Sequence, residues 1–172
     1  MILSKIAILE EYKKGNIIYK SMVGNKIEDF AKNQSVDLHI GEYIYVNDIW
    51  QKLGGVIPKG TFFLAYTEEF IGTRGGSNIH PQFYQRSTMA RKGLSHTLAA
   101  WGDVGFFNRW AMEYYTLKDI EIYPGDRVAQ MSFNYTTESG DYTKETGNYQ
   151  KANNIDEVVK LWDRDMILPI NK

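Results

Sequence analysis

The chain of 172 residues contains no cysteine. This absence excludes disulfide bonds and every metal site that needs a thiolate ligand, including the zinc centre of the zinc-dependent deaminases. It also fits a reducing compartment, in which proteins keep few disulfides. We therefore expect neither a disulfide framework nor a bound zinc ion.

Long apolar runs are missing as well. The longest, TFFLAY at 61–66, is far shorter than the ~20 residues that a membrane-spanning helix needs. The opening segment MILSKIAILEEYKK is interrupted by Lys5, Glu10 and Glu11, unlike the apolar core of a secretory signal. These features predict a soluble, cytoplasmic protein with no membrane partner.

An excess of charge of one sign is also lacking. The chain has 20 basic and 21 acidic residues, and its net charge is −1. No overall basic field therefore favours nucleic acid as a partner. The hydrophobic fraction of 43% and the aromatic fraction of 14% are typical of a folded protein. The length suits one domain, residues 1–172.

The three histidines show no spacing typical of metal ligands. His39, His80 and His96 lie far apart in the sequence, and no HExxH-type motif is present. We expect structural or pocket-lining roles for these side chains, and no metal site built from the protein.

Alternating patterns dominate most of the chain and predict strands. After a short helix expected at 4–14, with Ser4 as its cap, polar and apolar residues alternate in SVDLHIGEYIYV (35–46), GTFFLAYTEEF (60–70) and DIEIYPGDRVAQMSF (119–133). Pro124 and Gly125 are placed as a type II turn prefers. Many short strands separated by turns indicate a mainly β barrel or sandwich.

The C-terminal part changes character twice. Residues 134–153 are polar apart from tyrosine rings, so we expect a flexible surface arm there. Residues 154–172 then predict a terminal helix, with Asn154 as its cap and Glu157 at the third helical position.

The stretch QRSTMARKGL (85–94) carries two arginines without neighbouring acids. Guanidinium groups and hydroxyl groups match the oxygens of a phosphate. Cations at a helix start also oppose the helix dipole, which favours a bound anion. The plainer alternative is a basic first turn of a surface helix.

Four blocks in order resemble the dCTP deaminase branch of the dUTPase superfamily: SVDLHIG (35–41), RSTMARKGL (86–94), AAWGDVGFFNRWAMEYYT (99–116) and YPGDRVAQMSF (123–133). The resemblance covers roughly residues 1–151. It implies a dUTPase-like distorted jelly-roll β-barrel with a short N-terminal helix, to which this chain adds the C-terminal helix. It also implies a homotrimer, alone or paired into a larger assembly, with active sites between subunits.

The resemblance assigns catalysis to three residues. Glu113, in an apolar strand, would be the general acid and base, because burial raises the proton affinity of a carboxylate. Arg91 and Ser87 would orient the water and the base. From the residues alone, an outward-facing strand position is the commoner explanation for Glu113.

The resemblance also implies a set of substrate contacts. Arg86 and Thr88 would face the triphosphate, which would carry Mg²⁺ as the cofactor. The other expected substrate contacts lie near the base and the sugar or belong to the C-terminal arm: Ala99, Asp103, Phe106, Gln130, Tyr149 and Lys151. An ordinary turn aspartate and a structural glutamine are the plainer alternatives for Asp103 and Gln130.

The expected reaction is hydrolytic, zinc-independent deamination of dCTP to dUTP and ammonia. Departures from the family pattern leave alternatives: no proline follows Asp103, and Asn148 replaces the usual lysine of the arm. The first alternative is a dUTP diphosphatase, or a bifunctional enzyme that forms dUMP. The second is a nucleotide sensor without catalysis.

Overall fold

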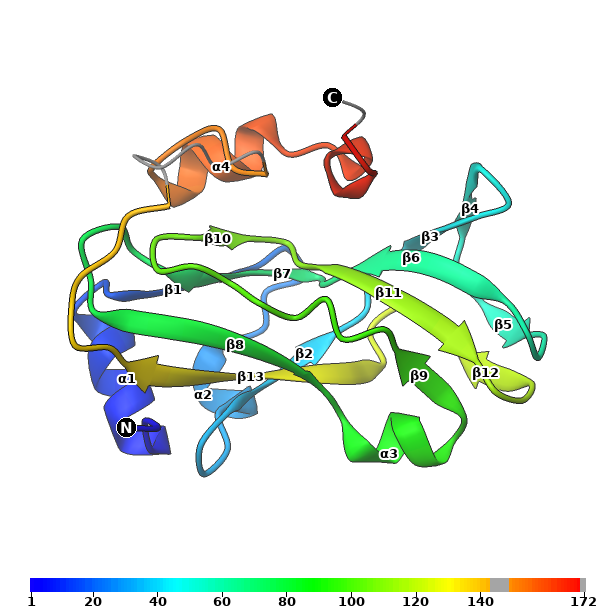
Figure 1. Cartoon of the computed structure of the whole chain (residues 1–172), viewed down its shortest axis with the longest axis horizontal. Helices are drawn as coiled ribbons and strands as arrows, with labels where there is room; N and C mark the ends of the chain where they lie inside the picture. Colours follow the sequence, from blue (N-terminus) through cyan, green and yellow to red (C-terminus); the bar gives the residue numbers. More distant parts are fainter. Residues whose placement is uncertain (143–148, 171–172) are drawn as a thin grey trace.

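Strands dominate the computed structural model, which describes residues 1–142 and 149–170 (Figure 1). The elements of the first half are α1 (Lys5–Lys13), β1 (Ile17–Ser21), α2 (Ile27–Phe30), β2 (Val36–His39), β3 (Tyr43–Val46), β4 (Ile49–Lys52), β5 (Gly55–Ile57), β6 (Phe62–Tyr66), β7 (Glu69–Thr73) and β8 (Ile79–Gln85). The elements of the second half are α3 (Ser87–Arg91), β9 (Leu94–His96), β10 (Phe107–Asn108), β11 (Ala111–Thr116), β12 (Ile120–Ile122), β13 (Arg127–Tyr135), α4 (Ile155–Leu161) and η1, a 3-10 helix (Arg164–Ile167).

The strands form antiparallel sheets that enclose one main core. The largest sheet has the order β4-β3-β6-β11-β9, and two three-stranded sheets have the orders β2-β13-β8 and β1-β7-β10. A two-stranded sheet, β12-β5, completes the set. Among the described residues no sheet closes on itself, so the expected barrel is an open, jelly-roll-like arrangement. The mainly β prediction is confirmed.

Alternation along β11 decides which of its side chains enter the core. Met112 and Tyr114 are fully buried in the main cluster. Each such side chain contributes roughly 1.5–3 kcal/mol through burial. Because successive side chains on a strand point to opposite faces, Ala111 and Glu113 project from the other face of the sheet.

The cap and the end of the first helix are as the sequence predicts. Helix α1 begins after Ser4, whose hydroxyl accepts a hydrogen bond from the Ala7 N–H at 3.4 Å. It ends before Gly15, which has φ +75°. The helix is one residue shorter at each end than the expected 4–14.

The turn before β13 is also confirmed. Gly125 has φ +83°, the left-handed conformation that the third position of a type II turn requires. The Asp126 N–H donates to the Tyr123 carbonyl at 3.1 Å and closes the turn.

The C-terminal part differs from its prediction in two respects. Strand β13 extends to Tyr135, and Gln150 and Ala152 are buried, so parts of the expected arm 134–153 belong to the packed structure. Residues 143–148 of that arm lie outside the described residues. The single helix expected over 154–172 is wrong in extent, because α4 ends at Leu161 and η1 follows; residues 171–172 also lie outside.

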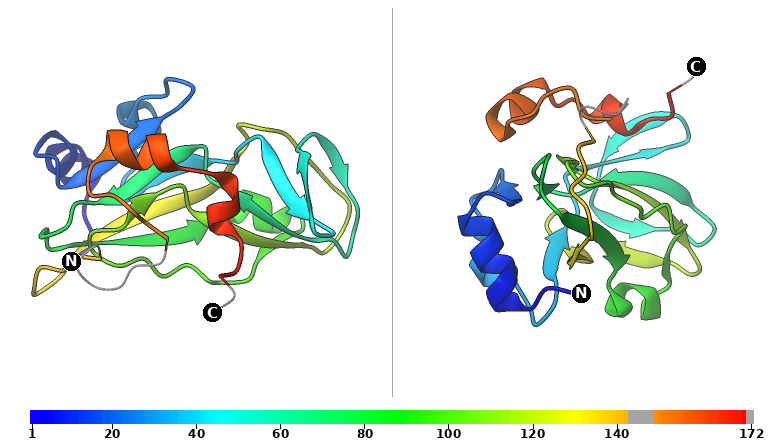
Figure 2. Two further views of the ribbon diagram at one scale, coloured as in Figure 1. Left: turned by 90° about the horizontal axis from the view of Figure 1, so that it is seen from above. Right: turned by 60° about the vertical axis from the view of Figure 1, so that its left-hand side comes forward.

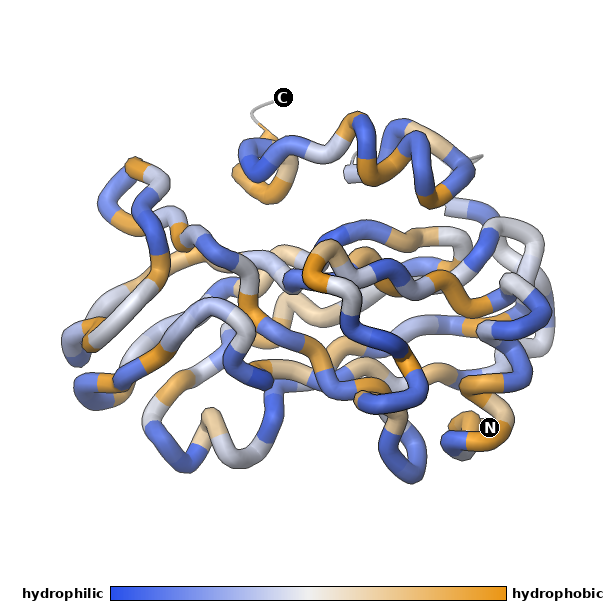
Figure 3. Tube along the Cα trace, turned by 180° about the vertical axis from the view of Figure 1, so that it is seen from behind, coloured by the Kyte–Doolittle hydropathy of each residue, from blue (hydrophilic) through white to orange (hydrophobic). Residues whose placement is uncertain are grey.

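The C-terminal segment, defined here as residues 154–170, packs across the body of the molecule. Its cap is as predicted, since the Glu157 N–H donates to Asn154 Oδ1 at 2.9 Å. Figure 2 shows α4 and η1 running over the strands, on a different side from α1. Hydrophobic positions recur along the segment (Figure 3), and Val158 is buried against Phe70 and Phe107.

The helices are all short. The longest in the described part of the chain, α1, has 9 residues. None of the described helices has the length and apolar character that crossing a membrane requires.

Candidate active site

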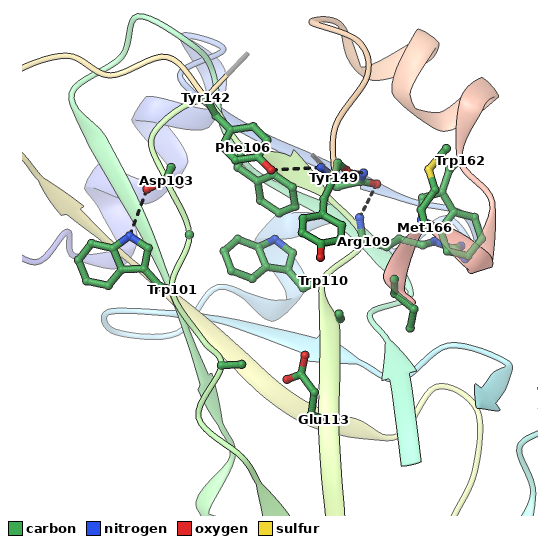
Figure 4. A pocket seen from close by; sticks show the side chains of 15 residues that line it. Trp101, Asp103, Phe106, Arg109, Trp110, Glu113, Tyr142, Tyr149, Trp162 and Met166 are labelled. Atoms are coloured by element: carbon green, nitrogen blue, oxygen red, sulfur yellow. Dashed lines mark hydrogen bonds between the residues drawn. The ribbon is translucent and has the colours of Figure 1, made fainter. Parts of the chain in front are cut away.

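A cavity of about 250 Å³ lies between the loop after β9, strand β11 and the C-terminal part of the chain (Figure 4). It gathers side chains from segments that are far apart in the sequence. Its lining residues are Ala99, Trp101, Gly102, Asp103, Phe106, Asn108, Arg109, Trp110, Ala111, Glu113, Tyr142, Tyr149, Trp162, Met166 and Ile167.

Glu113 is the acidic group at the centre of strand β11. Its side chain is 25% exposed, and its buried Oε2 atom has no hydrogen-bond partner. Burial raises the pKa of the Glu113 carboxyl. A carboxyl that faces a cavity with a raised pKa can both accept and return a proton near neutral pH.

His96 faces Glu113 from the neighbouring strand. Its Nε2 atom lies 3.6 Å from Glu113 Oε2, slightly beyond hydrogen-bond length. The Leu98 N–H donates to His96 Nδ1 at 3.1 Å, so the neutral ring carries its proton on Nε2, toward Glu113. Burial lowers the pKa of His96 and favours this neutral form. The sequence offers no signal for the contact, because it depends on the pairing of β9 with β11.

Four more of the expected site residues line the same cavity: Ala99, Asp103, Phe106 and Tyr149. Asp103 accepts a hydrogen bond at Oδ1 from the Trp101 indole N–H at 3.1 Å. Phe106 packs edge-on against Trp110, with ring centroids 5.1 Å apart. The structure therefore brings these residues together with Glu113.

Two glycines allow the loop that carries Asp103 to pack so closely. A Cβ atom on Gly102 would lie 2.0 Å from the Trp110 ring. Gly105 has φ +95°, and a Cβ atom there would lie 2.7 Å from the Tyr142 backbone nitrogen. The WGDVG sequence thus fixes the loop without the proline that the family pattern has after the aspartate.

The arm reaches the cavity through Tyr149, and Gln150 holds it there. Gln150 Oε1 accepts from the Phe107 N–H at 2.7 Å, and its Nε2 donates to the Gly105 carbonyl at 3.1 Å. The Tyr149 carbonyl accepts from Asn108 Nδ2 at 2.8 Å. Lys151, expected as a substrate contact, is exposed and does not line the cavity.

The expected residues on and next to α3 do not line this cavity: Arg86, Ser87, Thr88 and Arg91. Figure 1 places α3 at the edge of the molecule opposite α4. Ser87, Thr88 and Arg91 are exposed.

The expectation that Arg86 lacks an acidic partner is wrong. Its Nε atom lies 3.6 Å from Oδ1 of the buried Asp37. Arg127 Nη1 lies 3.2 Å from the other oxygen of the same carboxylate. The partner comes from β2, which pairs with β13, so no local pattern around Arg86 reveals it. For Arg91 the described residues provide no ion pair.

Gln130 lies on β13, opposite Asp37 on one side and Tyr84 on the other. It is half-buried and does not line the cavity. This position fits the plainer alternative, a structural strand residue.

Several lining residues were not expected from the sequence. Trp101, 75% exposed, packs against His80 with the two rings tilted by 53° and their centroids 4.5 Å apart. Arg109 and the C-terminal residues Trp162 and Met166 form the far wall. No group of three or more acidic residues or histidines that could hold a metal ion occurs in 1–142 and 149–170.

Comparisons with known proteins agree on one family. The family model described as dCTP deaminase-like matches residues 48–136. A protein of Clostridium beijerinckii named dCTP deaminase, dUMP-forming, is 31% identical over 148 residues, which cover 78% of this chain and 82% of that protein. A Clostridium botulinum protein of the same name is 31% identical over 104 residues, 60% of this chain and 58% of that protein.

Solved structures share the fold at low sequence identity. The 2′-deoxycytidine 5′-triphosphate deaminase from Agrobacterium tumefaciens superposes with a TM-score of 0.65 and 16% identity, over 78% of this chain and 48% of that chain. The native EIAV dUTPase has a TM-score of 0.50 and 18% identity, over 70% of this chain and 89% of that chain. The C-terminal segment lies beyond the residues that the family model matches.

Proposed function

Because the chain belongs to the dCTP deaminase-like family, we propose that it removes the 4-amino group of dCTP by hydrolysis and converts the product to dUMP. The observation that carries the proposal is Glu113, a half-buried carboxyl with a raised pKa and an unpartnered oxygen beside a cavity of about 250 Å³. Formation of dUMP is favoured over release of dUTP because the two clostridial relatives are named dUMP-forming.

In the first step Glu113 acts first as the general base and then as the general acid. It takes a proton from a water molecule as the oxygen adds to C4 of the pyrimidine. It then returns that proton to the 4-amino group, so the C4–N bond breaks and ammonia leaves. The proton that remains on the new oxygen moves to N3, which gives the 4-keto group of the uracil product. A pKa raised toward neutrality suits a group that must act as base and then as acid. The neutral His96 beside it would hold the carboxylate in one orientation.

The remaining cavity residues suit the nucleoside part of the substrate. Phe106 offers an apolar surface for the deoxyribose, and Asp103 offers a carboxylate for its hydroxyl group. Ala99 leaves room for the flat base between the loop and β11. In the second step a water molecule attacks the α-phosphate of dUTP, and pyrophosphate leaves; Asp103 is our candidate for orienting that water.

The residues of α3 would act at the active site of a second copy of the chain. Ser87 and Arg91 are exposed and do not line the cavity beside Glu113. If they orient water and base, a neighbouring chain must supply them, and a homotrimer with closed symmetry does so at every site. Mg²⁺ enters this proposal only with the substrate, held by the triphosphate oxygens.

The test is an incubation of the purified chain with dCTP and Mg²⁺, with ammonia, dUTP, dUMP and pyrophosphate all measured. We expect ammonia, dUMP and pyrophosphate in equal amounts. Ammonia with dUTP would limit the activity to deamination, whereas pyrophosphate from dUTP without ammonia from dCTP would make the chain a diphosphatase. Tight nucleotide binding with no product would contradict catalysis and favour a sensor.

A further inference from the structure

Arg109 lies at the start of the same row of side chains as Glu113. Residues 109, 111 and 113 all line the cavity, as alternation along an extended chain requires. Four extended residues span about 13 Å, so the guanidinium and the carboxyl mark opposite ends of the site. Figure 4 shows Arg109 at the end near Trp162, with Glu113 well away from it.

The Arg109 guanidinium sits among three aromatic rings. Its central carbon lies 4.3 Å from the ring centroid of Trp162 and 5.1 Å from those of Tyr66 and Phe70. Its buried Nε atom has no hydrogen-bond partner. Contacts with ring faces offset part of the cost of burying this charge, but they satisfy none of its N–H donors.

Three acidic side chains lie near Arg109, namely Glu42, Glu68 and Glu69, and the buried Oε2 atom of Glu68 has no hydrogen-bond partner. Glu68 Oε1 accepts from the Met22 and Val23 N–H groups at 2.5 and 3.1 Å. Glu69 pairs with His39. Within the described part of the chain, Arg109 forms no ion pair, in contrast to Arg86. Burial lowers the pKa of Arg109, as expected for a charge without a close counter-ion.

We propose that Arg109 is an anion-binding residue, which donates to a phosphate oxygen of the nucleotide from within the chain that supplies Glu113. This inference rests on the proposed function for the identity of the ligand, a nucleoside phosphate. Guanidinium groups bind phosphate oxygens through two parallel N–H donors. Trp162, from the C-terminal segment, holds the guanidinium flat and so orients those donors.

The first test uses inorganic triphosphate as the probe, with the full chain and calorimetric titration. We expect Arg109→Gln to bind triphosphate about 10- to 100-fold more weakly than the wild type, the range for losing a charge-assisted hydrogen bond. The matched control is Arg74→Gln, because the Arg74 side chain is exposed, donates to Asn16 and does not line the cavity. It should bind as the wild type does.

A second variant separates a binding role from a folding role. Trp162→Leu keeps the guanidinium but removes its closest ring, so we expect an intermediate loss of triphosphate affinity. If thermal unfolding shows that Arg109→Gln does not fold, the triphosphate affinity of Trp162→Leu tests the anion-binding role of Arg109 instead. Unchanged affinity in both variants, or no triphosphate binding by the wild type, would overturn the inference.

Turnover distinguishes this inference from the proposed function. With dCTP we expect Arg109→Gln to raise KM far more than it lowers kcat, and with deoxycytidine, which has no phosphate, to leave kcat/KM unchanged. A wild type that releases no ammonia, but loses triphosphate affinity on Arg109→Gln, would keep the anion site and refute deamination. A wild type that deaminates, with an unchanged KM in the variant, would refute the anion site alone.

Discussion

At the scale of single residues, the geometry around Glu113 is the most informative part of the molecule. Its carboxyl lies on a strand beside a cavity, with His96 Nε2 3.6 Å from Oε2. The raised pKa follows from burial, which disfavours the charged form of the carboxyl. Both the proposed chemistry and the stability of the protein should therefore depend on this one group.

Glu113→Gln should remove deamination while leaving nucleotide binding. General acid–base catalysis contributes about 10²- to 10⁴-fold, so ammonia release from dCTP should fall by at least that range. The affinity for dCTP, measured by titration calorimetry, should stay within a few-fold. Glu121→Gln on the exposed side of β12 is the control and should keep full activity. Deamination retained by Glu113→Gln would remove this residue from the mechanism.

The same substitution should change how stability depends on pH. A carboxyl whose pKa is raised on folding favours the folded state below its unfolded pKa of about 4.3. That contribution is lost as pH rises through the higher folded pKa. The melting temperature of Glu113→Gln minus that of the wild type should therefore increase as pH rises above about 4.3. A constant difference between pH 4 and pH 8 would contradict the raised pKa.

At the scale of elements, alternation and turn signals were predictable, and contacts between distant elements were not. The sequence placed Glu113 in a strand, Asn154 at a helix cap and Gly125 in a turn, because each depends on residues within a few positions. The partner of Arg86 was missed, since Asp37 reaches it only through the pairing of β2 with β13.

The C-terminal elements show the same limit. Polar composition predicted a break at Asn134, whereas β13 continues to Tyr135, and it gave no sign that Gln150 is buried. The single helix predicted over 154–172 is two elements, α4 and η1. Trp162 leaves the helical conformation and packs against Tyr66 and Arg109. Tertiary packing, which no local pattern encodes, decides where this helix ends.

Gln150→Ala should loosen the arm. The side chain satisfies one N–H and one carbonyl of the 105–107 backbone, and leaving such groups unpaired costs about 1–3 kcal/mol each. We expect a lower melting temperature and weaker dCTP binding, because Tyr149 loses its anchor. Gln51→Ala on the exposed face of β4 is the matched control. Equal dCTP affinity in the two variants would mean that the arm does not contribute to binding.

At the scale of the whole molecule, the expected site residues divide into two groups. Glu113, Asp103 and Phe106 line one cavity, whereas the residues of α3 are exposed beyond it. Phe62 and Tyr115, opposite each other on β6 and β11, are 52% and 41% exposed. They share the strand face of Glu113, so exposed apolar side chains continue the face that lines the cavity.

Mixing two inactive variants tests the division directly. Glu113→Gln and Arg91→Ala should each be inactive alone, and light scattering should show trimers for both. In trimers formed from equal amounts of the two, about a quarter of the sites combine an intact Glu113 with an intact neighbouring Arg91. We expect ammonia release at about that fraction of the wild-type rate. No recovery in mixed trimers would mean that both residues act within one chain.

The placement of the tryptophans has a practical consequence. The chain has four, and Trp101, Trp110 and Trp162 line the cavity, while Trp50 lies on β4. Three of the four indoles therefore lie where an entering ligand would change their surroundings, so the protein carries its own optical reporter of occupancy. Trp50→Phe would remove the fourth emitter, at the cost of the hydrogen bond from the Trp50 indole N–H to Asp165 Oδ1 at 2.6 Å.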